Sequence, residues 1–231
     1  MPFFFLLFAL LLALPVIWPR IDLLASGLFY RAGQGFYLAD NIVLVSLHWL
    51  AYDGARALGV AFAVLAVVAD MRRRRVNGGD SKAWLFMLLA LLIGPVLIAN
   101  VGFKDHWGRF RPREVVEFGG AATFTPALEP HFENAHSNGS FVSGDGAFGF
   151  FLPTFAYIAP RRRSRTVFWG LMMAGGAFGF VRLAMGAHFL GDIIYAAFFM
   201  LASSAVVHAV MYGKQQTMAQ WRSWFSRSEN V

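Results

Sequence analysis

Long apolar stretches separated by short polar segments follow one another along the chain. Several approach the roughly 20 residues that a helix needs to cross a bilayer. The pattern predicts an all-α polytopic membrane protein, with a single domain over residues 1–231 and about six spans. The expected spans cover residues 2–18, 55–70, 83–103, 141–160, 166–187 and 189–212. Repeated glycine in 166–187 favours close packing of that helix against its neighbours.

The composition also favours a membrane protein. The hydrophobic class makes up 58% of the residues and charged residues only 14%, whereas soluble domains have roughly 45–50% and about 25%. The first apolar run lacks the basic segment and the clear small-x-small cleavage site of a signal peptide, so we predict a retained first span. The chain has no cysteine, which excludes disulfides, thiol nucleophiles and thiolate metal sites.

The net charge of +7 comes largely from short basic clusters beside the apolar runs. Such clusters are typical of membrane topology and of contacts with anionic headgroups, so we predict no nucleic-acid partner. Twelve Lys and Arg lie in the 71–82 loop, the 161–165 loop and the tail, which six spans place on one side. The positive-inside rule makes that side cytoplasmic, with both termini there. The outward side then holds the connections 19–54, 104–140 and 186–190.

Positive charge nevertheless occurs on the outward side. Four cations follow the third run within one short stretch: Lys104, Arg109, Arg111 and Arg113. Cations that accumulate against the topology rule need a reason, and an anionic ligand provides one.

Two further polar groups come to the same face. One opens the fourth run and the other lies between the fifth and sixth; they consist of Ser143, Gly144 and Asp145, and of Arg182, His188 and Asp192. If the chain is helical through His188 and Asp192, their i,i+4 spacing puts both side chains on one face. A carboxylate bonded to one ring nitrogen fixes the tautomer and leaves the other nitrogen available.

Together the groups indicate a phosphoryl-transfer site. Lys104, Arg111 and Arg182 would neutralise phosphoryl oxygens. The Ser143 hydroxyl and the amides near Gly144, at the start of a helix, would complete the anion site.

The nucleophile of such a site would be His188. It would attack phosphorus to give a phosphohistidine, with Asp192 holding the imidazole, and water would then release phosphate.

The order and spacing of the three groups resemble the three-part signature of the type 2 phosphatidic acid phosphatase (PAP2) superfamily. The matching residues are Lys104-x6-Arg111-Pro112, Ser143-Gly144 and Arg182-x5-His188-x3-Asp192. That family includes bacterial membrane phosphatases that act on lipid phosphates, and soluble vanadium-dependent haloperoxidases. The resemblance implies a PAP2-type helical bundle, with His188 as nucleophile and Asp192 as its partner. The phosphate ligands that it implies are Lys104, Arg111, Ser143, Gly144 and Arg182. It also implies hydrolysis without a metal or other cofactor.

The chain departs from the family at the second motif. The usual form is Pro-Ser-Gly-His, whose histidine is thought to protonate the leaving oxygen, whereas this chain has Asp145 at that position. Three interpretations are open. Asp145 is the general acid, which we favour; or it orients a water or a distant donor, with His106 or His136 taking over protonation; or the leaving group needs little help.

Other polar residues have plainer interpretations. We predict a surface or interfacial role for His48 and Asp53, and headgroup contacts for Arg109 and Arg113.

The combined prediction is a phosphatase of phosphorylated membrane lipids at the periplasmic face of a bacterial inner membrane. Lipid A is the first choice of substrate, because some members that resemble lipid A phosphatases also depart from histidine at the second motif. Undecaprenyl pyrophosphate and phosphatidylglycerophosphate follow. A lipid phosphotransferase is the alternative enzyme, and a non-catalytic anion or lipid binder or transporter is the alternative of another class. The oligomeric state is not predicted.

Overall fold

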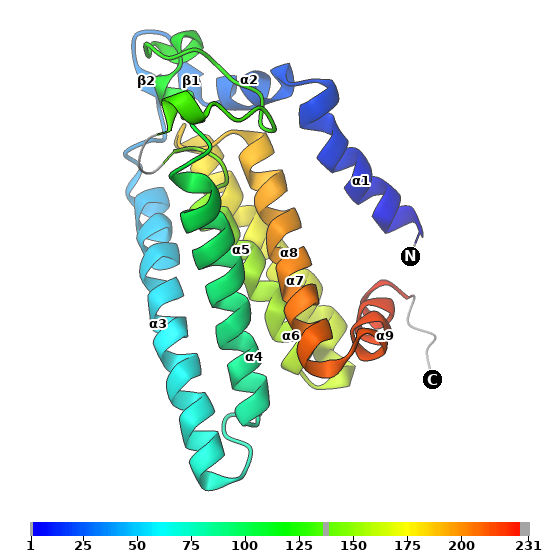
Figure 1. Cartoon of the computed structure of the whole chain (residues 1–231). Helices are drawn as coiled ribbons and strands as arrows, with labels where there is room; N and C mark the ends of the chain where they lie inside the picture. The colour runs from blue at the N-terminus through cyan, green and yellow to red at the C-terminus, as the bar shows by residue number, and fades with distance from the viewer. Residues whose placement is uncertain (1, 136–138, 227–231) are drawn as a thin grey trace.

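The chain is helical almost throughout (Figure 1). The computed structural model describes residues 2–135 and 139–226. The longer helices are α1 (Pro2–Ile17), α2 (Arg20–Gly27), α3 (Ile42–Arg72), α4 (Ser81–Leu91) with its π-helical continuation η1 (Leu92–Lys104), α5 (Gly144–Phe151), α7 (Arg161–Ala184), α8 (Leu190–Tyr212) and α9 (Lys214–Phe225). The short elements are β1 (Tyr30–Arg31), β2 (Gly35–Phe36), η2 (Pro112–Glu114), η3 (Val116–Phe118), η4 (Phe132–Asn134), η5 (Leu152–Thr154) and α6 (Phe155–Ile158).

A cap of short elements covers one end of the bundle, at the top of Figure 1. The antiparallel pair β1–β2 aligns Tyr30 with Phe36. An apolar cluster beneath it contains Phe36, Val115, Phe118 and Phe189. Because Phe189 follows His188 directly, this cluster fixes the turn between α7 and α8 against the cap.

The polytopic all-α class is confirmed, with fewer full-length spans than the six predicted. Within the described residues, four helices are long and apolar enough to cross a membrane: α3, α4 with η1, α7 and α8. A fifth span results if α1 and α2, which are bent by 95° at Trp18–Pro19, are counted as one broken span.

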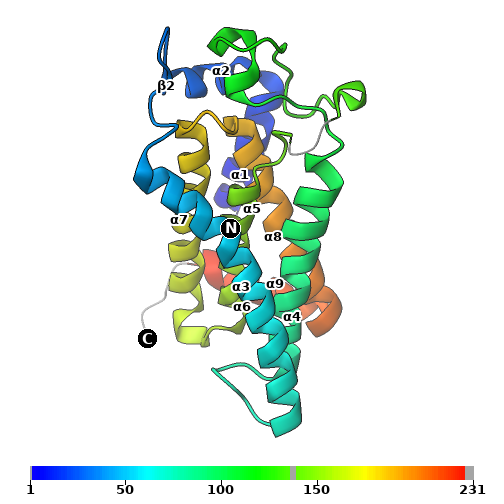
Figure 2. The same cartoon turned by 90° about the vertical axis from the view of Figure 1, so that its left-hand side faces the viewer.

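The second span begins earlier than predicted. We assigned 42–54 to an outward connection, but these residues form the first turns of α3. Asn41 starts the helix, since its side chain accepts hydrogen bonds from the backbone of Val43 and Leu44, a common way to satisfy N-terminal amides. In Figure 2, α3 lies on the outside of the bundle, in front of α5 and α8.

The fourth predicted span, 141–160, is not one continuous helix. It consists of α5, η5 and α6, which together run from Gly144 to Ile158. Pro153 lies in η5, where it removes a backbone donor and interrupts the regular helix. Although short, α5 packs against α3, η1, α7 and α8 and is thus the centre of the bundle.

Two glycines of α7 confirm the predicted close packing. A Cβ added to Gly175 would lie 3.0 Å from backbone atoms of Gly149 on α5, and one added to Gly179 would lie 2.4 Å from Ile193 on α8. Side chains at these positions would push the helices apart.

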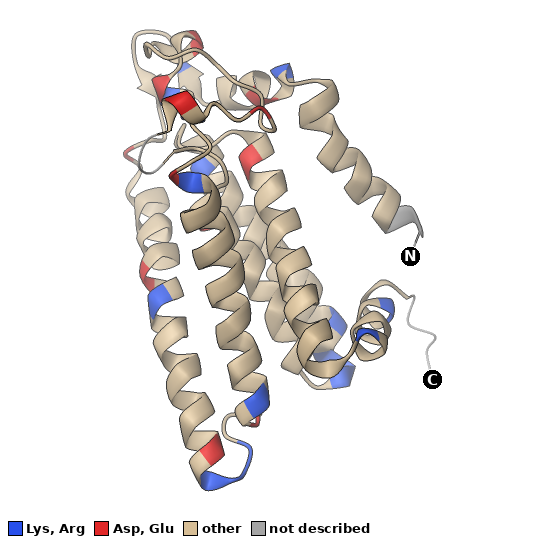
Figure 3. Cartoon of the chain, viewed as in Figure 1, with Lys and Arg blue, Asp and Glu red and all other residues tan. Residues whose placement is uncertain are grey.

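The charged residues gather toward the two ends of the bundle (Figure 3). The basic α3–α4 connection, the α6–α7 turn and α9 lie at the end opposite the cap (Figures 1 and 3). The end of η1, the start of α5 and the α7–α8 turn lie at the cap end. The three motif groups therefore meet at one end of the protein, as the predicted topology requires.

Candidate active site

The start of α5 forms one side of the site. Ser143 is the N-cap, and its hydroxyl accepts a hydrogen bond of 3.1 Å from the backbone N–H of Gly146. A Cβ added to Gly144 would lie 3.0 Å from Nζ of Lys104. Glycine thus allows the ammonium at the end of η1 to approach the first turn of the helix, where unpaired amides favour anions.

Three cations converge on this turn from different elements: Lys104 from η1, Arg111 from the following loop and Arg182 from α7. Nε of Arg182 is buried without a hydrogen-bond partner among the described residues; Oδ2 of Asp145 is 3.6 Å away. Burial, helped by the neighbouring charges of Arg113 and Arg182, lowers the pKa of Arg111 to about 10. A bound anion would relieve the repulsion and give Nε of Arg182 a partner.

The turn between α7 and α8 holds His188. Its Nδ1–H donates a hydrogen bond of 2.7 Å to the carbonyl oxygen of Ser140, so Nε2 carries the lone pair. Burial, helped by the charges of Arg111 and Arg182, lowers the pKa of His188 to about 3. The imidazole is therefore neutral at neutral pH, as a nucleophile must be.

Asp192 and His188 do approach each other, but not on one helix. Between them the chain is a turn until α8 begins at Leu190, so the assumption of continuous helix is wrong. Asp192 lies in the first turn of α8, where its carboxylate accepts from the backbone of Phe189 at 2.8 Å and from the Ser140 hydroxyl at 2.6 Å. Its distance to Nδ1 of His188 is 3.7 Å. Asp192 thus holds the α7–α8 turn through Phe189 and also holds Ser140, whose carbonyl orients His188.

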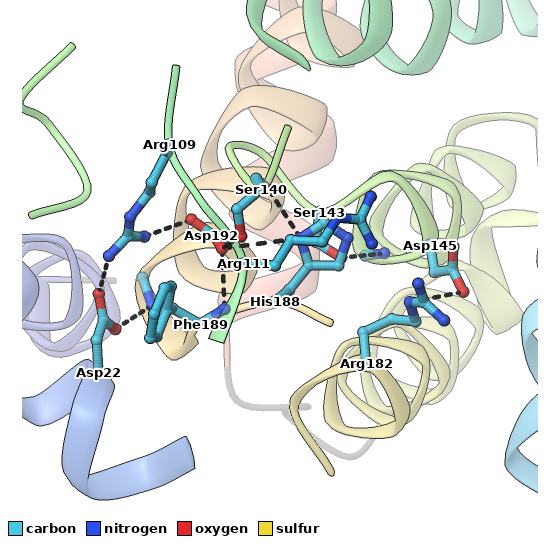
Figure 4. A network of polar contacts seen from close by, with 12 residues as sticks. Asp22, Arg109, Arg111, Ser140, Ser143, Asp145, Arg182, His188, Phe189 and Asp192 are labelled. Atoms are coloured by element: carbon cyan, nitrogen blue, oxygen red, sulfur yellow. Dashed lines mark hydrogen bonds and ion pairs between the residues drawn. The ribbon is translucent and has the colours of Figure 1, made fainter. Parts of the chain in front are cut away.

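The prediction that Arg109 contacts lipid headgroups is wrong. It is fully buried, and its guanidinium bridges Asp192 and Asp22 of α2 (Figure 4). Asp22 in turn accepts from the backbone of Gly191 at 2.7 Å. The sequence signal was an acid inside the apolar run Ile21-Asp22-Leu23-Leu24, which is part of the 19–54 connection that we placed on the outward side.

The prediction for His48 also needs correction. Its Nδ1–H donates a hydrogen bond of 2.7 Å to Oδ2 of Asp145, from α3 to α5. The side chain is 26% exposed and lines the site cavity. Asp53, in contrast, is exposed beside Arg56, as expected. His106 is exposed and does not line that cavity, and His136 lies outside the described residues.

A cavity of about 790 Å³ opens from these residues. Five of the eight predicted site residues line it: Lys104, Arg111, Gly144, Asp145 and Arg182. The other three, Ser143, His188 and Asp192, are buried next to them. In Figure 4, His188 lies between the Ser140–Asp192 contacts on one side and the Arg182–Asp145 pair on the other.

The rest of the cavity wall is largely apolar. It is formed by α3, α4, η1 and α5 through Gly59, Leu91, Leu92, Pro95, Val96 and Phe148. Nowhere in the described chain do three or more His, Asp or Glu side chains form a group that could hold a metal ion. The arrangement combines a cationic end with an apolar wall and suits a phosphorylated amphiphile.

Comparison with known families gives this site a context. Residues 81–216 match the model of the PAP2 superfamily, which is more than half of the chain and includes all eight predicted site residues. The chain belongs to the PAP2 superfamily. The PAP2 match begins at α4 and therefore leaves out α1, α2 and α3.

Similar proteins extend the PAP2 relationship to most of the chain. A lipid A 4′-phosphatase of Francisella tularensis subsp. novicida is 32% identical over 206 residues, which cover 87% of this chain and 90% of that protein. A lipid A 4′-phosphatase of Rhizobium etli is 35% identical over 168 residues, or 73% of this chain and 60% of that protein. No solved structure matches the chain. The protein is thus a PAP2 membrane phosphatase.

Proposed function

We propose that the protein removes a phosphate from lipid A, at the 4′ position. The main support for this proposal is the cavity, because its cationic end matches a phosphomonoester while its apolar wall matches the acyl part of a lipid. The names of the similar proteins favour lipid A among phosphorylated lipids.

The first step is transfer of the phosphoryl group to the enzyme. Lys104, Arg111 and Arg182 hold the phosphoryl oxygens and stabilise the charge that develops on them. Nε2 of His188 attacks phosphorus in line with the leaving sugar oxygen. The Ser140 carbonyl keeps the proton on Nδ1, so the reacting nitrogen keeps its lone pair. The product of this step is a phosphohistidine, which water then hydrolyses.

The proposed location is the inner membrane, with the active site in the periplasm and both termini in the cytoplasm. Support comes from the basic connections at the end of the bundle opposite the site, which the positive-inside rule assigns to the cytoplasm.

Phosphate release from a lipid panel tests the activity. Purified wild type, His188→Ala and His131→Ala are assayed with chelator on lipid A, lipid A lacking the 4′-phosphate, undecaprenyl pyrophosphate and phosphatidylglycerophosphate. His131 is a matched control, since it pairs with Glu133 outside the cavity. We expect release only from lipid A with its 4′-phosphate, unchanged in His131→Ala and reduced at least roughly 1,000-fold in His188→Ala.

The other outcomes separate the alternatives. Release from a different lipid would reassign the substrate, and transfer of labelled phosphate to a lipid hydroxyl would make the enzyme a transferase. Binding of lipid A by wild type without any release would indicate a non-catalytic binder. A phosphohistidine predicts that labelled phosphate becomes attached to wild type by an acid-labile bond and that His188→Ala lacks this label. Equal turnover by both proteins would exclude the phosphohistidine.

A further inference from the structure

His48 and Asp145 form a contact that joins distant parts of the chain at the cavity. The two residues are 97 positions apart, on α3 and α5, and their side chains meet at 2.7 Å. Because the carboxylate accepts, Nδ1 of His48 carries a proton. In the described part of the chain, Nε2 of His48 has no hydrogen-bond partner, although the side chain lines the cavity.

The charges around this contact favour an ionised Asp145. Its Oδ2 receives the hydrogen bond from His48 and lies 3.6 Å from Nε of Arg182. A carboxylate that accepts a hydrogen bond and lies beside a cation is more stable ionised than protonated. Asp145 is thus a poor proton donor in this arrangement and a good counter-charge for an imidazolium.

His48 also faces other charged and titratable groups. Lys104 comes from η1, Arg111 and Arg113 from the loop, and Tyr52 and Arg56 from α3 itself. Among the described residues, the carboxylate in direct contact with the His48 ring is that of Asp145, and its negative charge opposes these cations.

We propose that His48 protonates the leaving oxygen and that Asp145 is the residue that positions it. This assignment rests on the proposed phosphatase function and deepens it. A histidine on α3 then supplies the proton that the second motif, which ends in Asp145, does not.

The proton transfers balance over the two steps. As the bond from Nε2 of His188 to phosphorus forms, the bond from phosphorus to the sugar oxygen breaks, and that oxygen takes the electron pair and the Nε2 proton of His48. In the second step His48, now neutral, accepts a proton from water while the water oxygen bonds to phosphorus and the N–P bond breaks. Phosphate leaves, and His48 is again protonated.

The test compares His48→Gln with wild type on lipid A and on aryl phosphates of increasing leaving-group acidity. We expect about a 100-fold or larger loss on lipid A, as for loss of a general acid. The loss in the phosphorylation step, measured as the burst of phenol release, should shrink as the phenol becomes more acidic. Tight binding of inorganic phosphate should persist. His131→Gln serves as the matched control.

Asp145→Asn tests whether Asp145 is itself the general acid or positions His48 as the general acid. Without its charge, the imidazolium of His48 is less stable, so the basic limb of the rate–pH profile should move to lower pH, while His48→Gln should lack this limb. Turnover of lipid A by His48→Gln within threefold of wild type would overturn the proposal, as would a loss independent of the leaving group. These outcomes are distinguishable from failure of the phosphatase assignment, because wild type itself would then release no phosphate.

Discussion

Two charged clusters flank His188, and they differ in completeness. The inner cluster consists of Asp22, Arg109 and Asp192; it is fully buried, and each of its ionised groups has a charged partner. The cavity cluster consists of His48, Asp145 and Arg182; it lines an open cavity, and within the described residues Nε of Arg182 has no hydrogen bond there. A completed charge network holds the backbone in place, whereas an incomplete one can receive a ligand.

Breaking the inner cluster should have the largest effect. Arg109→Ala leaves two carboxylates buried close together without a cation, and removing one partner of a buried pair costs about 3–5 kcal/mol. We expect a large drop in the free energy of unfolding, measured in detergent with increasing denaturant. Arg113→Ala, on the neighbouring cavity wall, is the control. Unfolding of Arg109→Ala at the wild-type midpoint would show that the cluster is not structural.

Breaking the cavity cluster should instead affect activity. Arg182→Gln removes a charge-assisted hydrogen-bond donor to phosphate, which corresponds to about 1.5–3 kcal/mol, or roughly a 10- to 150-fold loss in kcat/KM. Stability should fall less than in Arg109→Ala, since Arg182 has a single ion pair of 3.6 Å with Asp145, which keeps its hydrogen bond from His48. Loss of folding together with activity would remove the distinction between the two clusters.

Acidification should lower the stability of the folded protein through His188, which lies between the two clusters. The unfolded chain protonates His188 near pH 6.5, but the folded protein does so only near pH 3. Between these values the unfolded state binds more protons, so stability falls with falling pH, by up to about 1.4 kcal/mol per pH unit. The difference in stability between wild type and His188→Gln, measured from pH 7 to pH 4, should show this slope. A flat difference would mean that the folded ring also takes up a proton.

The sequence was sufficient to predict how the three motif groups meet. Lys104, Ser143 and His188 lie at the ends of separate apolar runs, and the alternation of spans forces these ends to one side. The extra residues were harder to find because nothing in the local pattern connects them. Arg109 and Asp22 are 87 positions apart, and only packing brings their charges together.

Helix limits were predicted less well than helix positions. The start of α3 was missed because His48 and Asp53 interrupt its apolar pattern, although Asn41 is a good capping residue. The break inside 141–160 follows from Pro153, which an average over apolar residues does not register. Both errors concern elements that line or support the cavity.

The link from α2 to the catalytic turn bears on which part of the chain is the working unit. The family match starts at residue 81, yet Asp22 holds Gly191 and Arg109 from outside it, and His48 reaches Asp145 from outside it as well. A fragment cut at the edge of the match would keep every motif residue while losing what fastens the nucleophile's turn. For expression, fusion or the exchange of segments between relatives, the first 72 residues therefore belong with the enzyme.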